Sequence, residues 1–241
     1  NACCTSCTGD FSQNSLGVGC SDPYTADRNS SQGSLRPKYA VNATTGVHTH
    51  PSGAPGIGGS TVARRLQVAI TDLEVSDYSG STKYVVEGQY VAADDAANGH
   101  KNNNAAWRPL TVSGSGTTWT FGVTGTNPDV ETRRQQAGIM AWKEIEPSIT
   151  ITNIITPEAA NADPDLTIAL VIVGAKATDL GNGVWHYEYA VQNLNSDRSI
   201  CSFSVPLPNY VNVIPGSIDF HDVDYRNGDG EGWVNRDGTT W

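Results

Sequence analysis

The feature that most constrains this chain is a run of alternating side chains over residues 181–207. Its first half carries aromatic and β-branched residues at every second position, which places them on one face of a strand. These residues are Trp185, Tyr187, Tyr189 and Val191. Alternation returns over residues 201–207, after a polar connection at 193–198 whose side chains favour turns. The pattern predicts an antiparallel hairpin with Trp185 buried in a core.

Further strands are expected along most of the chain, because β-branched and alternating segments recur between turn-forming residues. We expect them at 66–73, 84–91, 107–112, 118–123, 138–142, 148–155, 166–175, 211–214 and 217–220. The nearly continuous apolar run at 166–175 predicts a central strand buried on both faces. Residues 92–106 are expected to form a polar loop, and residues 129–136 a short helical turn. The sequence therefore predicts an all-β protein, an antiparallel β-sandwich of Ig-like or jelly-roll-like kind.

The first part of the chain, residues 1–60, has no strand periodicity and is rich in Ser, Gly, Asn, Thr and Pro. Four of the five cysteines lie here, at Cys3, Cys4, Cys7 and Cys20. We predict two disulfides rather than a zinc site, because adjacent Cys3 and Cys4 do not have the spacing of zinc ligands. The sequence leaves open which cysteines pair. We therefore expect a long disulfide-stapled N-terminal arm at 1–60, followed by a sandwich at 61–241. The sequence does not decide whether the sandwich divides into two β units near residue 146. Cys201 is expected to be buried and reduced.

The net charge and the expected cellular compartment limit which partners the protein could bind. The formal net charge of -10 repels phosphate backbones, so nucleic acid is not an expected partner. No apolar run approaches the ~18 residues of a transmembrane segment. Disulfides and a start at Asn1 fit a secreted chain after leader removal, so we expect an extracellular or cell-surface protein. The end at Trp241 suggests a clipped chain or a final strand supplied from elsewhere.

The acidic segment 219–231 is the best cation candidate. Calcium prefers about six to eight oxygen ligands from carboxylates, amides and carbonyls in one loop. The side chains that could supply them are Asp222, Asp224, Asn227, Asp229 and Glu231. The spacing does not match an EF-hand, and the alternative is a solvated acidic turn.

Other candidate sites rest on single residue types. His48 and His50 form an H-x-H pair that could share a transition metal if both lie on a strand, with His100 or His221 as a third ligand. The alternative is a pair of exposed loop histidines. Trp233 and Trp241 are expected to contact a glycan or another protein chain. Catalytic carboxylates are candidates only by type, and they are Glu87, Glu144, Glu146 and Glu188.

Five segments also resemble an uncharacterised family of bacterial secreted β-rich proteins. They lie at residues 16–24, 86–95, 102–108, 185–206 and 220–225. The resemblance implies secretion and brings no activity and no catalytic residues. It also implies that members continue beyond the position of Trp241.

Taken with the lack of a G-x-S-x-G motif, these features favour a non-enzymatic role. We expect a secreted structural or adhesive surface protein that self-assembles through its arm and an open sheet edge. Its partners would be further copies of itself or surface glycans. The alternatives are a calcium-assisted polysaccharide-binding module and, less favoured, a metal-dependent extracellular enzyme around His48, His50 and His221.

Overall fold

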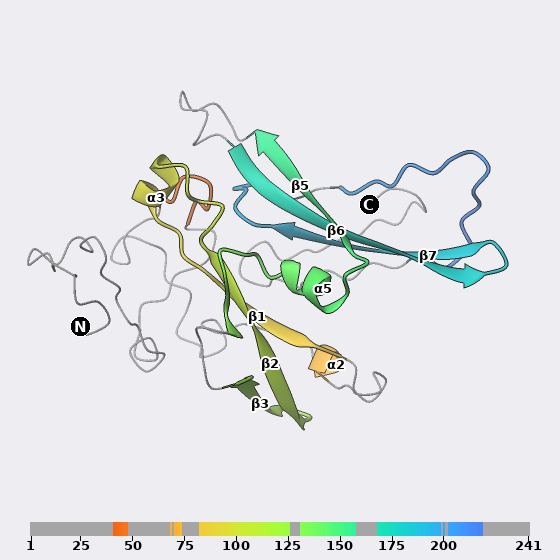
Figure 1. Cartoon of the computed structure of the whole chain (residues 1–241), viewed down its shortest axis with the longest axis horizontal. Coiled ribbons are helices and arrows are strands. Elements are labelled where there is room, and N and C mark those ends of the chain that lie inside the picture. The colour runs from red at the N-terminus through yellow and green to blue at the C-terminus, as the bar shows by residue number, and fades with distance from the viewer. Residues whose placement is uncertain are drawn as a thin grey trace, which may run out of the picture.

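The computed structural model describes residues 41–47, 68, 70–73, 82–125, 131–157, 168–198, 200 and 202–218. In these ranges the chain forms two antiparallel sheets and a few short helices (Figure 1). The all-β class is therefore confirmed. The sandwich arrangement and the stapled arm stay predictions. No helix among the described residues has the length and hydropathy that crossing a membrane requires.

The first sheet has four strands. They are β1 (Tyr84–Gln89), β2 (Ala105–Ser115), β3 (Thr118–Val123) and the short β4 (Arg133–Arg134). β2 is central: β1 pairs with it along one side, and β3 and β4 pair with successive parts of it. β2 and β3 form a tight hairpin in which Ser115 lies opposite Thr118. The strands predicted near 84–91, 107–112 and 118–123 are confirmed.

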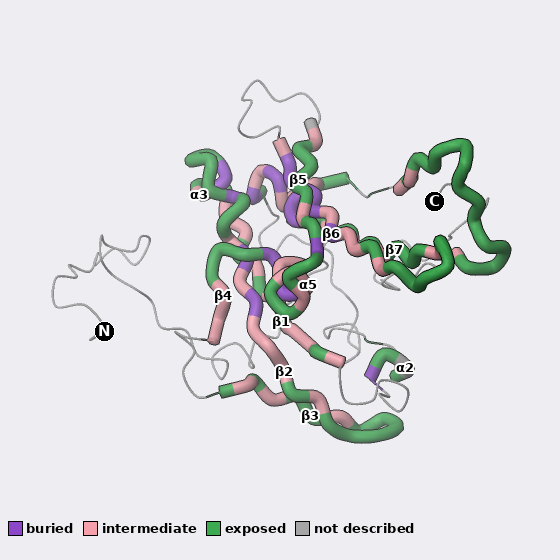
Figure 2. Tube along the Cα trace, turned by 45° about the vertical axis from the view of Figure 1, so that its right-hand side comes forward, coloured by how far each residue is buried: buried purple, intermediate pink, exposed green. Residues whose placement is uncertain are grey.

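The second sheet has three strands in the order β5-β6-β7. They are β5 (Thr150–Pro157), β6 (Ile168–Gly181) and β7 (Val184–Asn193). β6 is the central strand, and its residues 169–172 are all buried (Figure 2). The predicted buried central strand and the strand at 148–155 are both confirmed.

The hairpin that contains β7 differs from the predicted one. β7 pairs with β6, which precedes it, through a turn at Asn182 and Gly183. Both turn residues have positive φ, 56° and 77°, as a type I′ hairpin turn requires. The described residues 202–207 form only a single bridge, at Ser204, so the predicted second strand at 201–207 is wrong. Pro206 and Pro208 in this segment lack the N–H that a strand ladder uses.

Three short helices stand where the sequence predicted other structure. They are α2 (Ile70–Leu73), α3 (Ala93–Ala97) and α5 (Met140–Ile145). α2 replaces the described end of a predicted strand, α3 lies in the predicted polar loop, and α5 replaces the strand predicted at 138–142. In the helical turn predicted at 129–136, the described residue Glu131 is helical, and β4 follows at Arg133–Arg134. The described residues of the last two predicted strands, 211–214 and 217–218, form no strand.

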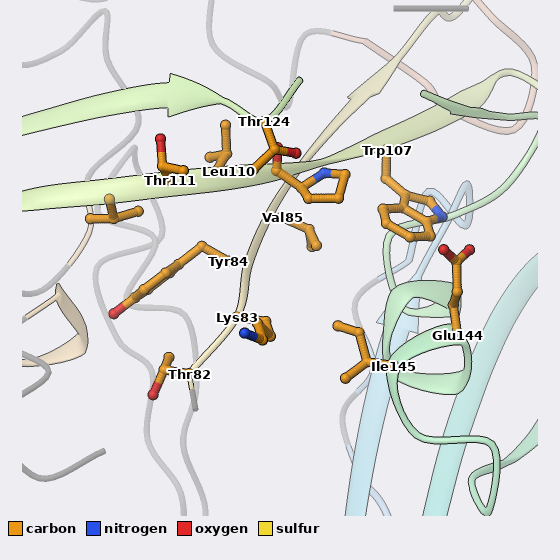
Figure 3. A pocket seen from close by; sticks show the side chains of 12 residues that line it. Thr82, Lys83, Tyr84, Val85, Trp107, Leu110, Thr111, Thr124, Glu144 and Ile145 are labelled. Atoms are coloured by element: carbon orange, nitrogen blue, oxygen red, sulfur yellow. The ribbon is translucent and has the colours of Figure 1, made fainter. Parts of the chain in front are cut away.

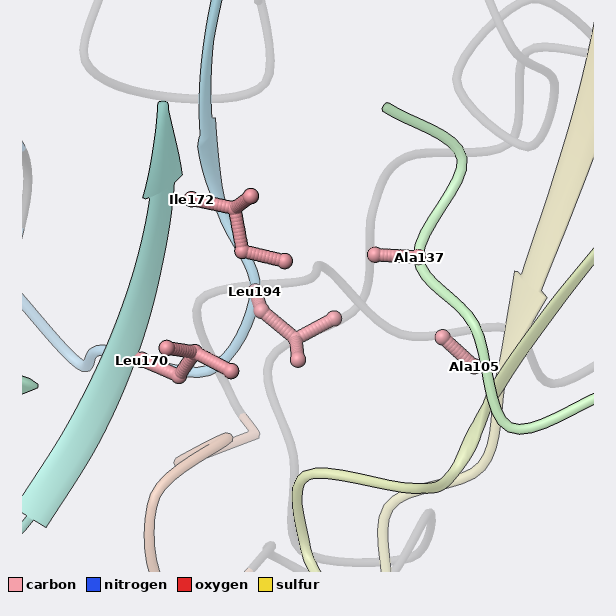
Figure 4. Packing of buried hydrophobic residues seen from close by; sticks show 5 residues of the cluster. All are labelled: Ala105, Ala137, Leu170, Ile172 and Leu194. Carbon is pink, nitrogen blue, oxygen red and sulfur yellow. The ribbon is translucent and has the colours of Figure 1, made fainter. Parts of the chain in front are cut away.

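The main hydrophobic cluster joins the two sheets (Figure 4). Its buried members are Ala105, Ala137, Leu170, Ile172 and Leu194, with Ile139 and Ile151 packed against them. β2 and β6 therefore share one core, although each belongs to a different sheet. Burial of these side chains supplies the favourable term that holds the sheets together.

A buried polar residue, Asn195, reinforces this core. It is 1% exposed, and its Oδ1 accepts a hydrogen bond from the backbone N–H of Leu170 at 2.8 Å. Its Nδ2 donates to the carbonyl of Lys101 and to Oδ1 of Asn102, and its carbonyl accepts from the buried hydroxyl of Thr44. The connection after β7 is thus directed toward the core of the molecule. This also explains why the chain does not fold straight back along β7.

Candidate functional site

Most of the site residues chosen from the sequence lie outside the described ranges. They are Cys3, Cys4, Cys7, Cys20, Cys201, His48, His50, His221, Asp222, Asp224, Asn227, Asp229, Glu231, Trp233 and Trp241. The disulfides, the calcium loop and the tryptophan contacts therefore stay predictions. Among the residues that the structure does describe, no three His, Cys, Asp or Glu side chains gather closely enough to hold a metal ion.

The candidate carboxylates that are described each have a structural partner. Lys176 Nζ lies 2.7 Å from Glu146 Oε1 and 3.5 Å from Glu188 Oε2, so one ammonium group pairs with both carboxylates. Hydrogen bonding to Glu146 is the main cause that raises the pKa of Lys176. Such paired carboxylates stabilise local structure, and this arrangement does not point to acid–base chemistry.

Glu144 is held by Arg133 in a bidentate contact. Arg133 Nη2 and Nε donate to the carboxylate of Glu144 at 2.6 and 2.9 Å, and this hydrogen bonding lowers the pKa of Glu144. The guanidinium carbon of Arg133 also lies 5.6 Å from the ring centroid of Trp107, within the range of a cation–π contact. Trp107 is buried, and its indole N–H has no hydrogen-bond partner within the part of the chain that the structure describes.

A pocket of about 530 Å³ opens beside this group (Figure 3). Its walls are mostly apolar and come from β1, β2 and the C-terminal end of α5. Figure 3 shows Val85 facing Trp107 and Ile145, with Tyr84 on the other side of the β1 strand. The volume falls in the range of small-molecule sites, about 300–1,000 Å³. The polar side chains that line it bring no nucleophile beside a base.

Glu87 connects the two sheets. Its carboxylate accepts hydrogen bonds from the backbone N–H of Gly138 and from Nε2 of Gln192, the latter at 2.7 Å. Oε1 of Gln192 in turn accepts from the N–H of Ile139 at 2.9 Å. β1, the start of α5 and β7 are therefore tied by one hydrogen-bond network. Glu87 therefore helps to hold the two sheets together, a role that its residue type alone does not predict.

The most unusual feature is the outer face of β7, where large apolar side chains are exposed. The exposed fractions are 51% for Trp185, 52% for Tyr187, 39% for Tyr189 and 37% for Val191. The alternation predicted from the sequence is present, but the prediction that Trp185 is buried is wrong. The opposite face of β7 turns toward the core, because Gln192 lies opposite buried Ile172 and bonds Glu87.

Small residues on that opposite face explain why it, and not the face with Trp185, packs against the rest of the protein. Gly174 on β6 lies opposite Ala190 on β7, and the Trp142 ring packs closely over Gly174. α5 packs on this side of the sheet, where Gly174 carries no side chain and leaves room for the Trp142 ring. The bulky row from Trp185 to Val191 is thereby left on the other side.

The same face continues onto the neighbouring strands, where it is less exposed: Val171 is buried and Val173 and Ala175 are half-buried. Val173 and Ala175 of β6 lie opposite Val191 and Tyr189, and Ile154 of β5 lies opposite Val171 of the same face. Phe203 covers part of it, with its ring centroid 5.3 Å from that of Tyr189. This burial raises the pKa of Tyr189, with a smaller contribution from Tyr187. We call the side chains of Ile154, Trp185, Tyr187, Tyr189 and Val191 the apolar face.

Among the described residues, a recognition surface is therefore better supported than a catalytic site. An exposed apolar patch of this kind is typical of an interaction site. The sequence contained the signal for it in the alternation of β7, but not the side on which the core lies. Comparisons of this chain with family models, with curated proteins and with solved structures find no match.

Proposed function

We propose that this chain is a secreted, non-enzymatic structural or adhesive protein that self-associates through its β5–β7 sheet. The observation that carries the proposal is the apolar face, whose side chains stand exposed along β7 and β5. Four cysteines within the first twenty residues support an oxidising, extracellular compartment.

The size of the apolar face makes association favourable but weak. Half-exposed aromatic side chains contribute on the order of 100 Å² each, so the face offers roughly 300–400 Å² per copy. Two copies that bury these faces against each other remove roughly 600–800 Å² from water, well below the ~1,200–2,000 Å² of a stable protein–protein interface. Association costs about 4–15 kcal/mol in lost freedom of motion, so the face alone supports transient contacts. A lasting assembly needs additional contacts from the same sheet.

The test is the solution mass of the whole chain as its concentration rises, measured by sedimentation velocity. We expect reversible oligomers, and we expect Tyr187→Ser to weaken them because it removes an exposed ring from the apolar face. Tyr90→Ser is the matched control, because Tyr90 is 76% exposed and lies outside this face. A chain that stays monomeric at high concentration, or equal effects of both variants, would count against the proposal.

A second function, polysaccharide binding, is supported by the aromatic row itself. Trp185, Tyr187 and Tyr189 follow one another at every second position, about 7 Å apart along the strand. A row of exposed rings can stack against the apolar faces of sugar rings. Titration with soluble glycans, with and without a calcium chelator, separates this function from self-association. Loss of binding in Trp185→Ala and retention in Tyr90→Ser would support it.

A further inference from the structure

The outer edge of β5 lacks the features that usually protect a sheet edge. In the described part of the chain β5 pairs only with β6, over a ladder without register shifts. Residues 150–156 are uncharged, and all except Asn153 are β-branched. Thr152, Asn153, Ile154 and Ile155 are exposed. Exposed edges usually carry charges, prolines or bulges that prevent pairing with other chains. Of these features, β5 has only a proline, Pro157, at its end.

The other edge strand of the same sheet makes a useful comparison. β7 carries Glu188 and His186, and its ladder with β6 is irregular near Asp179. Phe203 also packs beside it. β5 is therefore the better template for an added strand. Backbone pairing of this kind gives affinity, and the side chains that alternate along the strand select the partner.

We propose that β5 pairs antiparallel with β5 of a second copy of this chain, across a two-fold axis at Asn153. This inference rests on the proposed self-association and names the strand that performs it. A two-fold contact uses the same surface on both copies, so β5 must be complementary to itself. Because the segment is uncharged, two acidic chains can meet there without placing like charges in contact.

The side chains select the register. An axis at Asn153 places the two Asn153 amides opposite each other, where each can both donate and accept hydrogen bonds. It also pairs Ile151 with Ile155 of the second copy, which joins β-branched residues across the strands. Moving the axis by one residue places Asn153 against Ile151 or Ile155. It also either shortens the overlap or brings Pro157, which has no backbone N–H, into the pairing. The Asn153 register therefore satisfies the amide and buries the most β-branched surface.

The consequence is one continuous sheet built from the three strands of each copy. Ile154 lies on the apolar face, so the faces of the two copies would join at β5. Backbone hydrogen bonds along β5 would supply the contacts that the apolar face alone lacks. The apolar faces then remain available on the assembled sheet for further copies or for a surface.

The first test is Asn153→Asp, which preserves the shape of an exposed side chain and places two carboxylates opposite each other across the axis. We expect the dissociation constant of the dimer to rise roughly tenfold to a hundredfold at neutral pH. Association should return below about pH 4, where the new carboxyl groups are protonated. Asn209→Asp is the matched control, because Asn209 is also exposed and the charge change is the same.

The second test locates the register by cross-linking. Residues directly opposite in an antiparallel pair have Cα atoms about 4.5–5.5 Å apart, within reach of a disulfide. Asn153→Cys should therefore link to itself between two copies under mild oxidation. Thr150→Cys should not, because the two copies of residue 150 lie about 20 Å apart in this register. Peptide mass analysis distinguishes the new link from those of the native cysteines.

The outcomes separate this inference from the function on which it rests. Weakened association in Asn153→Asp alone, together with the link between two copies of residue 153, supports the β5 pairing. If the wild-type chain associates but Asn153→Asp matches Asn209→Asp, or the cross-link is missing, the β5 pairing is wrong and self-association stands. If the wild-type chain never associates, both are overturned.

Discussion

At the scale of single residues, Glu144 links local structure to pH. Hydrogen bonding to Arg133 lowers the pKa of Glu144 in the folded chain. A carboxyl group with a lowered pKa stabilises the fold above its unfolded pKa of about 4.3. That contribution is lost as the pH falls through the lower, folded value. The contact also holds Arg133 over Trp107, so its loss would affect the wall of the pocket.

We predict that Glu144→Gln lowers the free energy of unfolding at about pH 7 and that the difference from wild type shrinks below about pH 4. The effect is small, because 44% of the Glu144 side chain is exposed and water screens the pair. Denaturant unfolding of both proteins across this pH range measures it. A difference that stays constant down to about pH 3 would show that the ion pair does not stabilise the fold.

Residue patterns predicted which side chains share a face but not which face is buried. Trp185 and Tyr187 do lie together on β7, as a period of two requires. Their exposure goes with the packing on the opposite side, where Gly174 leaves space for the Trp142 ring. That choice involves α5, which the sequence pattern assigned to a strand. A periodicity read within one segment holds no information about such a neighbour.

At the scale of elements, the packing of α5 on β6 depends on the absence of a side chain at Gly174. A Cβ built there would lie 3.0 Å from the Trp142 ring. We predict that Gly174→Ala lowers the free energy of unfolding by about 1–3 kcal/mol, because the ring must move out of its packed position. Denaturant unfolding followed by tryptophan fluorescence reports both the stability and the position of the ring.

The matched control is Gly88→Ala in β1. A Cβ at Gly88 would meet nothing within 4 Å, so alanine is expected to be neutral or to stabilise the strand by up to about 1 kcal/mol. Equal destabilisation by the two variants would show that loss of strand glycine, and not contact with Trp142, is responsible. The comparison therefore separates the packing of α5 on β6 from any general effect of replacing a glycine in a strand.

Strands with strong local signals were predictable, and short helices were not. β1, β2, β3, β5 and β6 coincide with β-branched or continuous apolar runs, so local pattern and final structure agree. α5 has only six residues, too few for helical periodicity to differ from a short apolar strand. The apolar run at 138–142 therefore fitted either structure. Its packing over Gly174 decided between them.

At the scale of the whole molecule, the described contacts between the two sheets join residues that are far apart in the sequence. Ala105 and Leu170 meet in the shared core, and Glu87 bonds Gln192 across the boundary. None of these long-range contacts follows from the sequence around either residue. The edge of β5, by contrast, is visible in the sequence as an uncharged β-branched run. Only the order of strands shows that this run lies at the edge of a sheet.

The net charge of -10 gives the proposed assembly a definite salt dependence. Two acidic copies repel each other, and the repulsion is screened over about 10 Å at about 0.1 M salt and about 3 Å at about 1 M. The β5 edge contributes no ion pairs that salt could weaken, because residues 150–156 are uncharged. We therefore predict that raising salt from about 0.05 M to about 0.5 M lowers the dissociation constant, measured by sedimentation.

Asn153→Asp should show a steeper salt response than Asn209→Asp, because its added charges face each other at the contact. Net charge is the same in both variants, so only the position of the new carboxylate differs. Association of the wild-type chain that weakens as salt rises would mean that ion pairs cross the interface. Such a result would exclude the uncharged β5 edge as the main contact. It would direct attention to β7, where Glu188 and His186 lie.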